Sequence, residues 1–256
     1  MHREPHSPIP ELYVSYDSAK KLKVEAGELP SWDLNARQLC DLELLMNGGF
    51  NPLKGFLTEE DYNGVVENMR LADGQLWPMP INLDVSEDFA GKLEIGQDIA
   101  LRDQEGVILA TITVTDRWTP NKAREAEKVF GADDDAHPAV NYLHNQAGPV
   151  YLGGPVTGIQ QPVHYDFKAR RDTPNELRAY FRKVGWRKVV AFQTRNPLHR
   201  AHQELTFRAA REAEANLLIH PVVGLTKPGD VDHFTRVRCY EAVLDQYPAA
   251  TTSMSL

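Results

Sequence analysis

The feature that most constrains this sequence is an alternation of helical and strand patterns that begins at residue 173. Thr173-Pro174-Asn175-Glu176 combines three helix-start signals: a threonine N-cap, a proline in the first turn and a glutamate three residues after the cap. A further helical pattern follows Asp232. Between these two points the apolar spacing predicts a helix, a strand, a helix and a strand at residues 175–185, 188–193, 201–213 and 216–224. Such alternation predicts an α/β layer with a parallel sheet.

The first half of the chain has a different pattern, which is typical of a mixed helix and strand domain. Residues 36–47 place apolar side chains at helical spacing and stop at Gly48-Gly49. Thr58 is a candidate N-cap before an acidic first turn. From residue 79 to residue 115, short apolar runs alternate with turn residues. This last pattern predicts a compact antiparallel sheet or barrel.

Length and charge limit the organisation of the chain and its partners. At 256 residues it has room for two domains, which we predict over residues 1–166 and 167–256. The formal net charge of −8 argues against nucleic acid and anionic membranes as partners, because both attract a positive surface. No apolar run resembles a signal peptide or a membrane span, and Cys40 and Cys239 form no Cys-x-x-Cys unit. These features predict a soluble, cytoplasmic chain with reduced thiols.

The chemically richest stretch is "VVAFQTRNPLHRAH", residues 189–202, in which an apolar run ends in a series of hydrogen-bond donors. In open α/β sheets, ligands bind at the carboxyl ends of strands, where a loop leads into a helix. Arg195 has a planar guanidinium that matches a tetrahedral oxyanion in two-point contacts. Gln193, Thr194 and Asn196 add donors without adding charge. This combination predicts a site for anions, one of them a nucleotide.

Two histidines complete the motif. A helix is expected to begin around Leu198, which would place His199 and His202 on one face of its first turn, where both can reach the same bound group. A single histidine near a helix start is more often a cap or a surface residue. A histidine pair can also be half of a metal site, but metals usually need carboxylate or thiolate ligands, and the motif contains neither. The polar residues taken together favour an anion site.

The absence of Asp and Glu from the motif indicates the kind of chemistry. Hydrolysis or activation of an alcohol would require a general base. A nucleophile that is already ionised at neutral pH, such as sulfate, requires none, and a nearby carboxylate would repel both it and the phosphates. Catalysis can then rest on positioning and on stabilising charge in the transition state.

Residues 193–202 resemble the signature of the ATP sulfurylase (sulfate adenylyltransferase) family, and two further segments carry the resemblance. These are "LCDLELLMNGGFNPLKGF" at 39–56 and "PVVGLTKPGDVDHFTRVRCYEAVL" at 221–244. The resemblance implies a mixed α+β PUA-like barrel domain, followed by the first part of a nucleotidylyltransferase domain with a Rossmann-like parallel sheet. It also implies reversible transfer of AMP from MgATP to sulfate, which gives adenylyl sulfate and pyrophosphate.

The resemblance also implies roles for residues of this chain. Gln193 and Arg195 would contact sulfate. ATP would be bound by Gln193, Thr194, Arg195, Asn196, His199 and His202. The catalytic residues would be Thr194, Arg195, Asn196, His199 and His202, with the two histidines stabilising the transition state and the departing pyrophosphate. Mg²⁺ would arrive with ATP without an assignable protein ligand, and the complete protein is expected to be a homo-oligomer.

One element of the family pattern is not found, and two alternative functions stay open. A second glycine-rich loop, Gly-Arg-Asp-His-Ala-Gly-Pro-Gly in the family, does not occur in the 256 residues, which end in a predicted strand. The activity of this chain by itself is therefore left open. One alternative is an adenylyl- or cytidylyltransferase of the same fold that acts on an organic phosphate, although such enzymes usually have glycine where this chain has Ala201. The other is a non-catalytic fragment or an RNA-binding PUA-like module, which the acidic charge disfavours.

Overall fold

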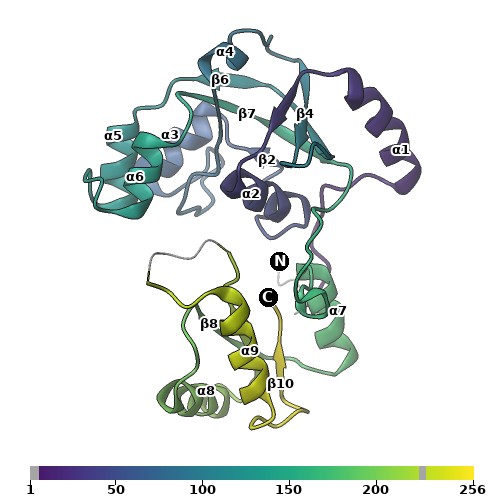
Figure 1. Cartoon of the computed structure of the whole chain (residues 1–256), viewed down its shortest axis with the longest axis vertical. Helices are drawn as coiled ribbons and strands as arrows, with labels where there is room; N and C mark the ends of the chain where they lie inside the picture. The colour runs from purple at the N-terminus through teal and green to yellow at the C-terminus, as the bar shows by residue number, and fades with distance from the viewer. Residues whose placement is uncertain (1–5, 225–228) are drawn as a thin grey trace. The chain divides into compact units, whose positions relative to one another are not determined.

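The computed structural model describes residues 6–224 and 229–256, and the chain folds into two compact units (Figure 1). One unit comprises residues 10–163, and the other comprises residues 164–256 together with the N-terminal residues before 10. The domain limits at 166 and 167 stay a prediction. None of the described helices has the length and apolar character that a bilayer-spanning helix requires.

The unit of residues 10–163 contains short helices and a curled sheet. Its helices are α1 (Tyr16–Glu25), α2 (Ala36–Met46), α3 (Glu59–Asn68), α4 (Glu87–Ala90), α5 (Lys122–Glu125) and α6 (Pro138–Asn145), with a 3-10 turn at Ala26–Glu28 and a π turn at Ala126–Phe130. Its strands are β1 (Ser31–Asp33), β2 (Gly55–Phe56), β3 (Leu83–Val85), β4 (Asp98–Arg102), β5 (Ile108–Thr113), β6 (Asp116–Trp118) and β7 (Val150–Gly158).

Local capping explains where two of these helices begin. The predicted helix at 36–47 is confirmed as α2, and the Asn35 side chain accepts a hydrogen bond from the Gln38 N–H at 2.9 Å. Thr58 is confirmed as the N-cap of α3, where its hydroxyl accepts from the Asp61 N–H. Both caps satisfy N–H groups that would otherwise lack partners at the helix start.

The sheet of this unit is curled because β7 changes partners along its length. The strand order is β1-β4-β5-β7-β2, with β3 and β6 also paired to β7, and every pair except parallel β1–β4 is antiparallel. Residues 150–153 of β7 pair with β3 and β6, whereas residues 154–158 pair with β2 and β5. At the change, Gly154 has a φ of +152°, and a Cβ there would lie 2.0 Å from the Thr113 carbonyl oxygen. Only glycine allows this close approach, and the expected antiparallel architecture is confirmed.

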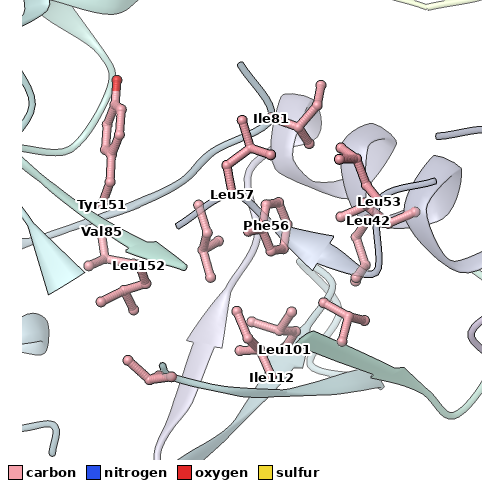
Figure 2. Close-up of a cluster of buried hydrophobic side chains, with 14 of the residues drawn as sticks. Leu42, Leu53, Phe56, Leu57, Ile81, Val85, Leu101, Ile112, Tyr151 and Leu152 are labelled. Carbon is pink, nitrogen blue, oxygen red and sulfur yellow. The ribbon is translucent and has the colours of Figure 1, made fainter. Parts of the chain in front are cut away.

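The core of this unit lies where α2 and the strands meet (Figure 2). Leu42, Phe56, Leu101, Ile112 and Leu152 come from α2, β2, β4, β5 and β7, and each is at most 2% exposed. Burying one such side chain contributes about 1.5–3 kcal/mol. The unit therefore has a hydrophobic core of its own.

The second unit is the predicted α/β layer. Its elements are a 3-10 turn (Lys168–Arg170), α7 (Pro174–Lys183), β8 (Val189–Thr194), α8 (Arg200–Glu212), β9 (Asn216–Pro221), α9 (His233–Leu244) and β10 (Thr252–Met254). The strands form a parallel sheet in the order β10-β9-β8, as the alternation predicts. The capping box predicted at the start of α7 is confirmed, because the Glu176 N–H bonds to Thr173 Oγ1 and the Thr173 N–H bonds to Glu176 Oε2 at 2.8 Å.

The helices of this unit pack on both faces of the parallel sheet. Leu218 of β9 packs with Phe181 of α7 and with Trp186. Its neighbours Leu217 and Ile219 belong to a separate cluster that includes Val237 and Tyr240 of α9. Successive strand residues point to opposite faces, so α9 and α7 cover opposite sides of β9. The N-terminal residues also contact α7: the Ile9 N–H donates to Asn175 Oδ1 at 2.9 Å, a contact that no local sequence pattern predicts.

Candidate functional site

The polar motif lies at the carboxyl end of β8, as expected, but the helix after it begins later than predicted. β8 ends at Thr194, and α8 begins at Arg200 rather than around Leu198. His199 has the extended backbone of an N-cap, with φ −94° and ψ 162°. His199 therefore precedes the first turn instead of lying in it. The later start is fixed by a cap, because the His199 N–H bonds to the His202 side chain and the first intrahelical bond runs from the Gln203 N–H to the His199 carbonyl at 3.0 Å.

The turn after β8 is closed by Thr194. Its hydroxyl oxygen accepts a hydrogen bond from the Asn196 N–H at 3.0 Å, and its O–H donates to the Asn196 carbonyl at 3.4 Å. Thr194 is half-buried, whereas Arg195 and Asn196 are exposed. The threonine thus supports the backbone of the turn, while the next two side chains face solvent.

Two buried residues of α9 donate hydrogen bonds to backbone carbonyls of the same turn. The guanidinium of Arg236 donates from Nη1 to the Arg195 carbonyl, and the Tyr240 hydroxyl donates to the Asn196 carbonyl. Arg236 is 2% exposed and Tyr240 is fully buried. Burial raises the pKa of the Tyr240 hydroxyl, which keeps it protonated and able to donate. The Asn196 N–H and the carbonyls of residues 195 and 196 are thus bonded within the unit, and Pro197 has no N–H to donate.

A carboxylate approaches Arg195, which corrects the expectation of a site without one. Asp230 Oδ2 lies 3.9 Å from Arg195 Nε, and the side chain of Asp230 is 18% exposed. The motif itself contains no acid, but the segment after β9 brings one to it. The separation is long for an ion pair, so the contribution of this contact to stability is small. The sequence suggests two alternatives for Lys227-Pro228-Gly229-Asp230, the edge of the anion site or a plain surface turn, and Lys227 and Pro228 lie outside the described residues.

The two histidines do meet, although not in the predicted way. The His199 N–H donates to His202 Nδ1 at 3.3 Å, and the two ring centroids lie 5.4 Å apart. His202 is half-buried and its ring lies 5.9 Å from that of Phe192, whereas His199 is exposed. The pairing therefore joins an N-cap residue to the third residue of the helix, and it leaves the two rings close enough to contact one ligand.

Gln193 lies at a different face of β8 from Thr194. Consecutive strand residues point to opposite sides, and Gln193 is exposed. Its partner in β9 is His220, whose Nδ1 lies 2.9 Å from the Ser255 carbonyl oxygen. Among the motif residues, the structure shows contacts between His199 and His202 and between Thr194 and Asn196, and Gln193 lies beside His220.

Sequence reasoning missed Arg236 and Tyr240, and it did not predict the approach of Asp230 to Arg195. A signal for the first was available: Arg236 precedes Val237 and stands four residues before Tyr240, so it shares the apolar face of α9. An arginine on the buried face of a helix requires an acceptor inside the protein. Among the described residues, no group of three or more His, Cys, Asp and Glu side chains is arranged to hold a metal ion.

Comparison with known proteins identifies both parts of the chain. A model for the PUA-like domain matches residues 3–161, and a model for ATP-sulfurylase matches residues 168–256. The expected order, a PUA-like domain followed by an α/β nucleotide-binding fold, is confirmed.

Similar proteins agree with these matches. The sulfate adenylyltransferase of Gibberella zeae is 59% identical over 240 residues, which are 92% of this chain and 42% of the relative. That of Schizosaccharomyces pombe is 54% identical over 93% of this chain and 49% of its own length. A solved structure described as a hexameric APS kinase from Thiobacillus denitrificans superposes with a TM-score of 0.80 at 37% identity, over 97% of this chain and 45% of that one. The chain thus spans about half the length of the proteins it matches.

Proposed function

Because this chain belongs to the ATP-sulfurylase family, we propose that it carries the substrate-binding loop of a sulfate adenylyltransferase. In the proposed reaction a sulfate oxygen attacks the α-phosphorus of MgATP, and the bond from that phosphorus to the bridging oxygen of the β-phosphate breaks. The products are adenylyl sulfate and pyrophosphate. Sulfate is already an anion, so no proton has to be removed.

The observation that carries the proposal is the fixed backbone of residues 194–196. Their carbonyls and the Asn196 N–H are bonded within the unit, while the side chains of Arg195 and Asn196 are exposed. Donors held by a rigid backbone stabilise developing charge without a cost of reorganisation. The N-terminus of α8 adds partial positive charge at the same place.

We assign roles to the exposed side chains accordingly. Arg195, with Gln193, is proposed to bind sulfate, because a guanidinium contacts two oxyanion oxygens at once. Gln193, Thr194, Arg195, Asn196, His199 and His202 are proposed to line the ATP site, and all except Gln193 are proposed as catalytic. The contact of His199 with His202 supports a shared target, which we take to be the phosphates.

The Mg²⁺ ion is proposed to enter as part of the substrate MgATP. The carboxylate seen beside the motif, Asp230, faces Arg195, and among the described residues no group of three or more His, Cys, Asp and Glu side chains is arranged to hold a metal ion. Phosphate oxygens are therefore the ligands we propose for the ion, as is common for Mg²⁺. When bound, the ion neutralises charge on the phosphates.

Pyrophosphate release in a chimera tests the proposed reaction. In this protein, called the Gibberella chimera below, residues 1–256 replace the matching segment of the Gibberella zeae sulfate adenylyltransferase. We expect pyrophosphate release from MgATP to depend on sulfate and not on glycerol phosphate. Release that depends on the organic phosphate would favour the alternative transferase. Salt-sensitive binding of RNA by the 256-residue chain, without release of pyrophosphate by the chimera, would favour the RNA-binding alternative.

We further propose that the complete protein forms a homo-oligomer and works in the cytoplasm. The structural relative from Thiobacillus denitrificans is described as hexameric, which supports the first point. Analytical ultracentrifugation of the chimera is expected to give a mass that corresponds to two or more subunits. Sedimentation as a monomer at micromolar concentration would contradict it.

A further inference from the structure

Arg236 is a buried arginine for which the described part of the chain offers no carboxylate. It is 2% exposed, and no Asp or Glu oxygen of the described residues lies within 4.0 Å of its nitrogens. Its Nη1 bonds to the Arg195 carbonyl, and its Nε is buried without a hydrogen-bond partner. A carbonyl oxygen neutralises only a small part of a full positive charge.

Such an arrangement is unfavourable for the folded chain by itself. Removing a cation from water is costly unless a counterion and further hydrogen bonds compensate. Groups that are costly to bury and that sit directly behind an exposed loop are candidates for a functional role. The loop in question holds Arg195 and Asn196, and an anion bound there would supply the missing negative charge.

Tyr240 makes the equivalent contact one residue further along the loop. It stands one helical turn after Arg236, is fully buried, and donates to the Asn196 carbonyl. One face of α9 therefore holds two consecutive carbonyls of the loop. The Thr194 hydroxyl holds the Asn196 N–H at 3.0 Å, so the backbone between the two exposed side chains is fixed from both sides.

We propose that Arg236 and Tyr240 are positioning residues for anion binding at this loop: they fix the backbone that presents Arg195 and Asn196, and Arg236 adds a buried positive charge behind it. This inference rests on the proposed function, because it takes the loop to be the oxyanion site. Beyond the loop residues of the proposed function, it assigns a role to two residues of α9 that do not contact the substrate themselves.

The test is calorimetric titration of pyrophosphate into the 256-residue chain, together with thermal unfolding of the same samples without ligand. Tyr240→Phe removes one hydroxyl, and we expect it to weaken binding about three- to tenfold, the effect of one lost hydrogen bond. The matched control is Tyr247→Phe. Tyr247 is also buried, in the hydrophobic cluster that contains Val237 and Tyr240, but its hydroxyl contacts Thr206 at 3.0 Å. Binding by this control is expected to change by less than about twofold.

Arg236→Met removes the charge and keeps an apolar stem. We expect pyrophosphate binding to weaken by more than about tenfold, while the midpoint of thermal unfolding stays within about 4 °C of the wild type, because an unpaired buried charge does little for stability. A residue with only a structural role would lower the midpoint instead. Arg238→Met, at an exposed position of the same helix, is the control for the loss of net charge.

The outcomes separate this inference from the proposed function. Wild-type binding of pyrophosphate that Tyr240→Phe and Arg236→Met leave unchanged would overturn the inference alone. If Arg236→Met does not fold, the comparison of Tyr240→Phe with Tyr247→Phe decides, and equal affinities would overturn the inference. No binding by the wild type would contradict the proposed oxyanion site, and the inference would fail with it.

Discussion

Arg195 is the residue whose geometry matters most to the proposed chemistry. Its guanidinium is exposed, while its carbonyl bonds to Arg236 and the next N–H bonds to the Thr194 hydroxyl. Arg195→Lys keeps the charge but loses the planar two-point contact with an oxyanion. In the Gibberella chimera we expect adenylyl sulfate formation to fall by about a hundredfold or more, as for the loss of one preorganised transition-state donor. The measurement is the initial rate of pyrophosphate release at saturating MgATP and sulfate.

Arg200→Lys serves as the control for Arg195→Lys. Arg200 is the first residue of α8, is exposed, and lies within the motif but has no proposed role. Its replacement is expected to leave the rate within about threefold of the wild type. Near-normal turnover of Arg195→Lys would remove Arg195 from the sulfate site.

His199 and His202 are expected to act on one group, because their rings lie 5.4 Å apart and one backbone N–H bonds to the other ring. His→Ala at either position should slow the forward and reverse reactions of the chimera, since both pass through the same transition state. The double variant should cost less than the sum of the two single losses, measured as free energies of activation from kcat/KM. Strictly additive losses would indicate separate targets.

At the scale of single elements, α2 contains a titrating group that should influence stability. Burial raises the pKa of Asp41 to about 6, with the Arg37 charge opposing the rise and the Asp84 charge adding to it. The ordinary value is 3.8, so the folded chain binds this proton more tightly than the unfolded chain. The free energy of unfolding should therefore fall as the pH rises from about 4 to about 6, by an amount on the order of 2 kcal/mol from this group.

Urea unfolding at several pH values measures this contribution. Asp41→Asn should lack it, so the difference in unfolding free energy between wild type and variant should change between about pH 4 and about pH 7. The control is Asp88→Asn on α4, where the carboxylate side chain is 81% exposed. Its free energy of unfolding should have the same pH dependence as that of the wild type. A parallel pH dependence of Asp41→Asn and wild type would contradict the raised pKa.

Elements with local signals were predictable from the sequence. The start of α7 follows from Thr173 and Glu176, whose groups bond to each other within one turn. The strand β8 was predictable from the apolar run that starts at Val189, and the polar residues at its end indicate the loop that comes next. The start of α8 was predicted about two residues early, because its N-cap is a histidine bonded to the His202 side chain, and histidine is not among the usual N-cap signals.

The contacts that were not predictable join residues far apart in the chain. Arg236 bonds to residue 195 and Tyr240 to residue 196, at separations of 41 and 44 residues. Asp230 reaches Arg195 only because β8 and β9 are parallel neighbours, so the segments after both strands emerge at the same edge of the sheet. In the first unit, the bend of β7 at Gly154 depends on the approach of Thr113 from β5. Each of these requires the tertiary fold.

At the scale of the whole molecule, the chain combines a domain with its own core and an α/β layer that carries the candidate site. The chain covers 42% and 49% of the Gibberella zeae and Schizosaccharomyces pombe relatives. The glycine-rich loop that the family resemblance associates with closure over ATP and sulfate does not occur in these 256 residues. A polypeptide of only these residues should therefore bind phosphates without aligning sulfate and the α-phosphate for reaction.

The most direct test of the central claim, that residues 193–202 form an oxyanion site for nucleotide phosphates, is titration of MgATP into the purified 256-residue chain, with adenylyl sulfate assayed in the same samples. We predict weak, saturable binding of MgATP that pyrophosphate displaces, because the donors of the loop and the α8 N-terminus are all present. We also predict no measurable adenylyl sulfate. Binding of neither MgATP nor pyrophosphate by the folded chain would contradict the site itself, and formation of adenylyl sulfate at the rate of the Gibberella chimera would show that these residues hold the whole active site.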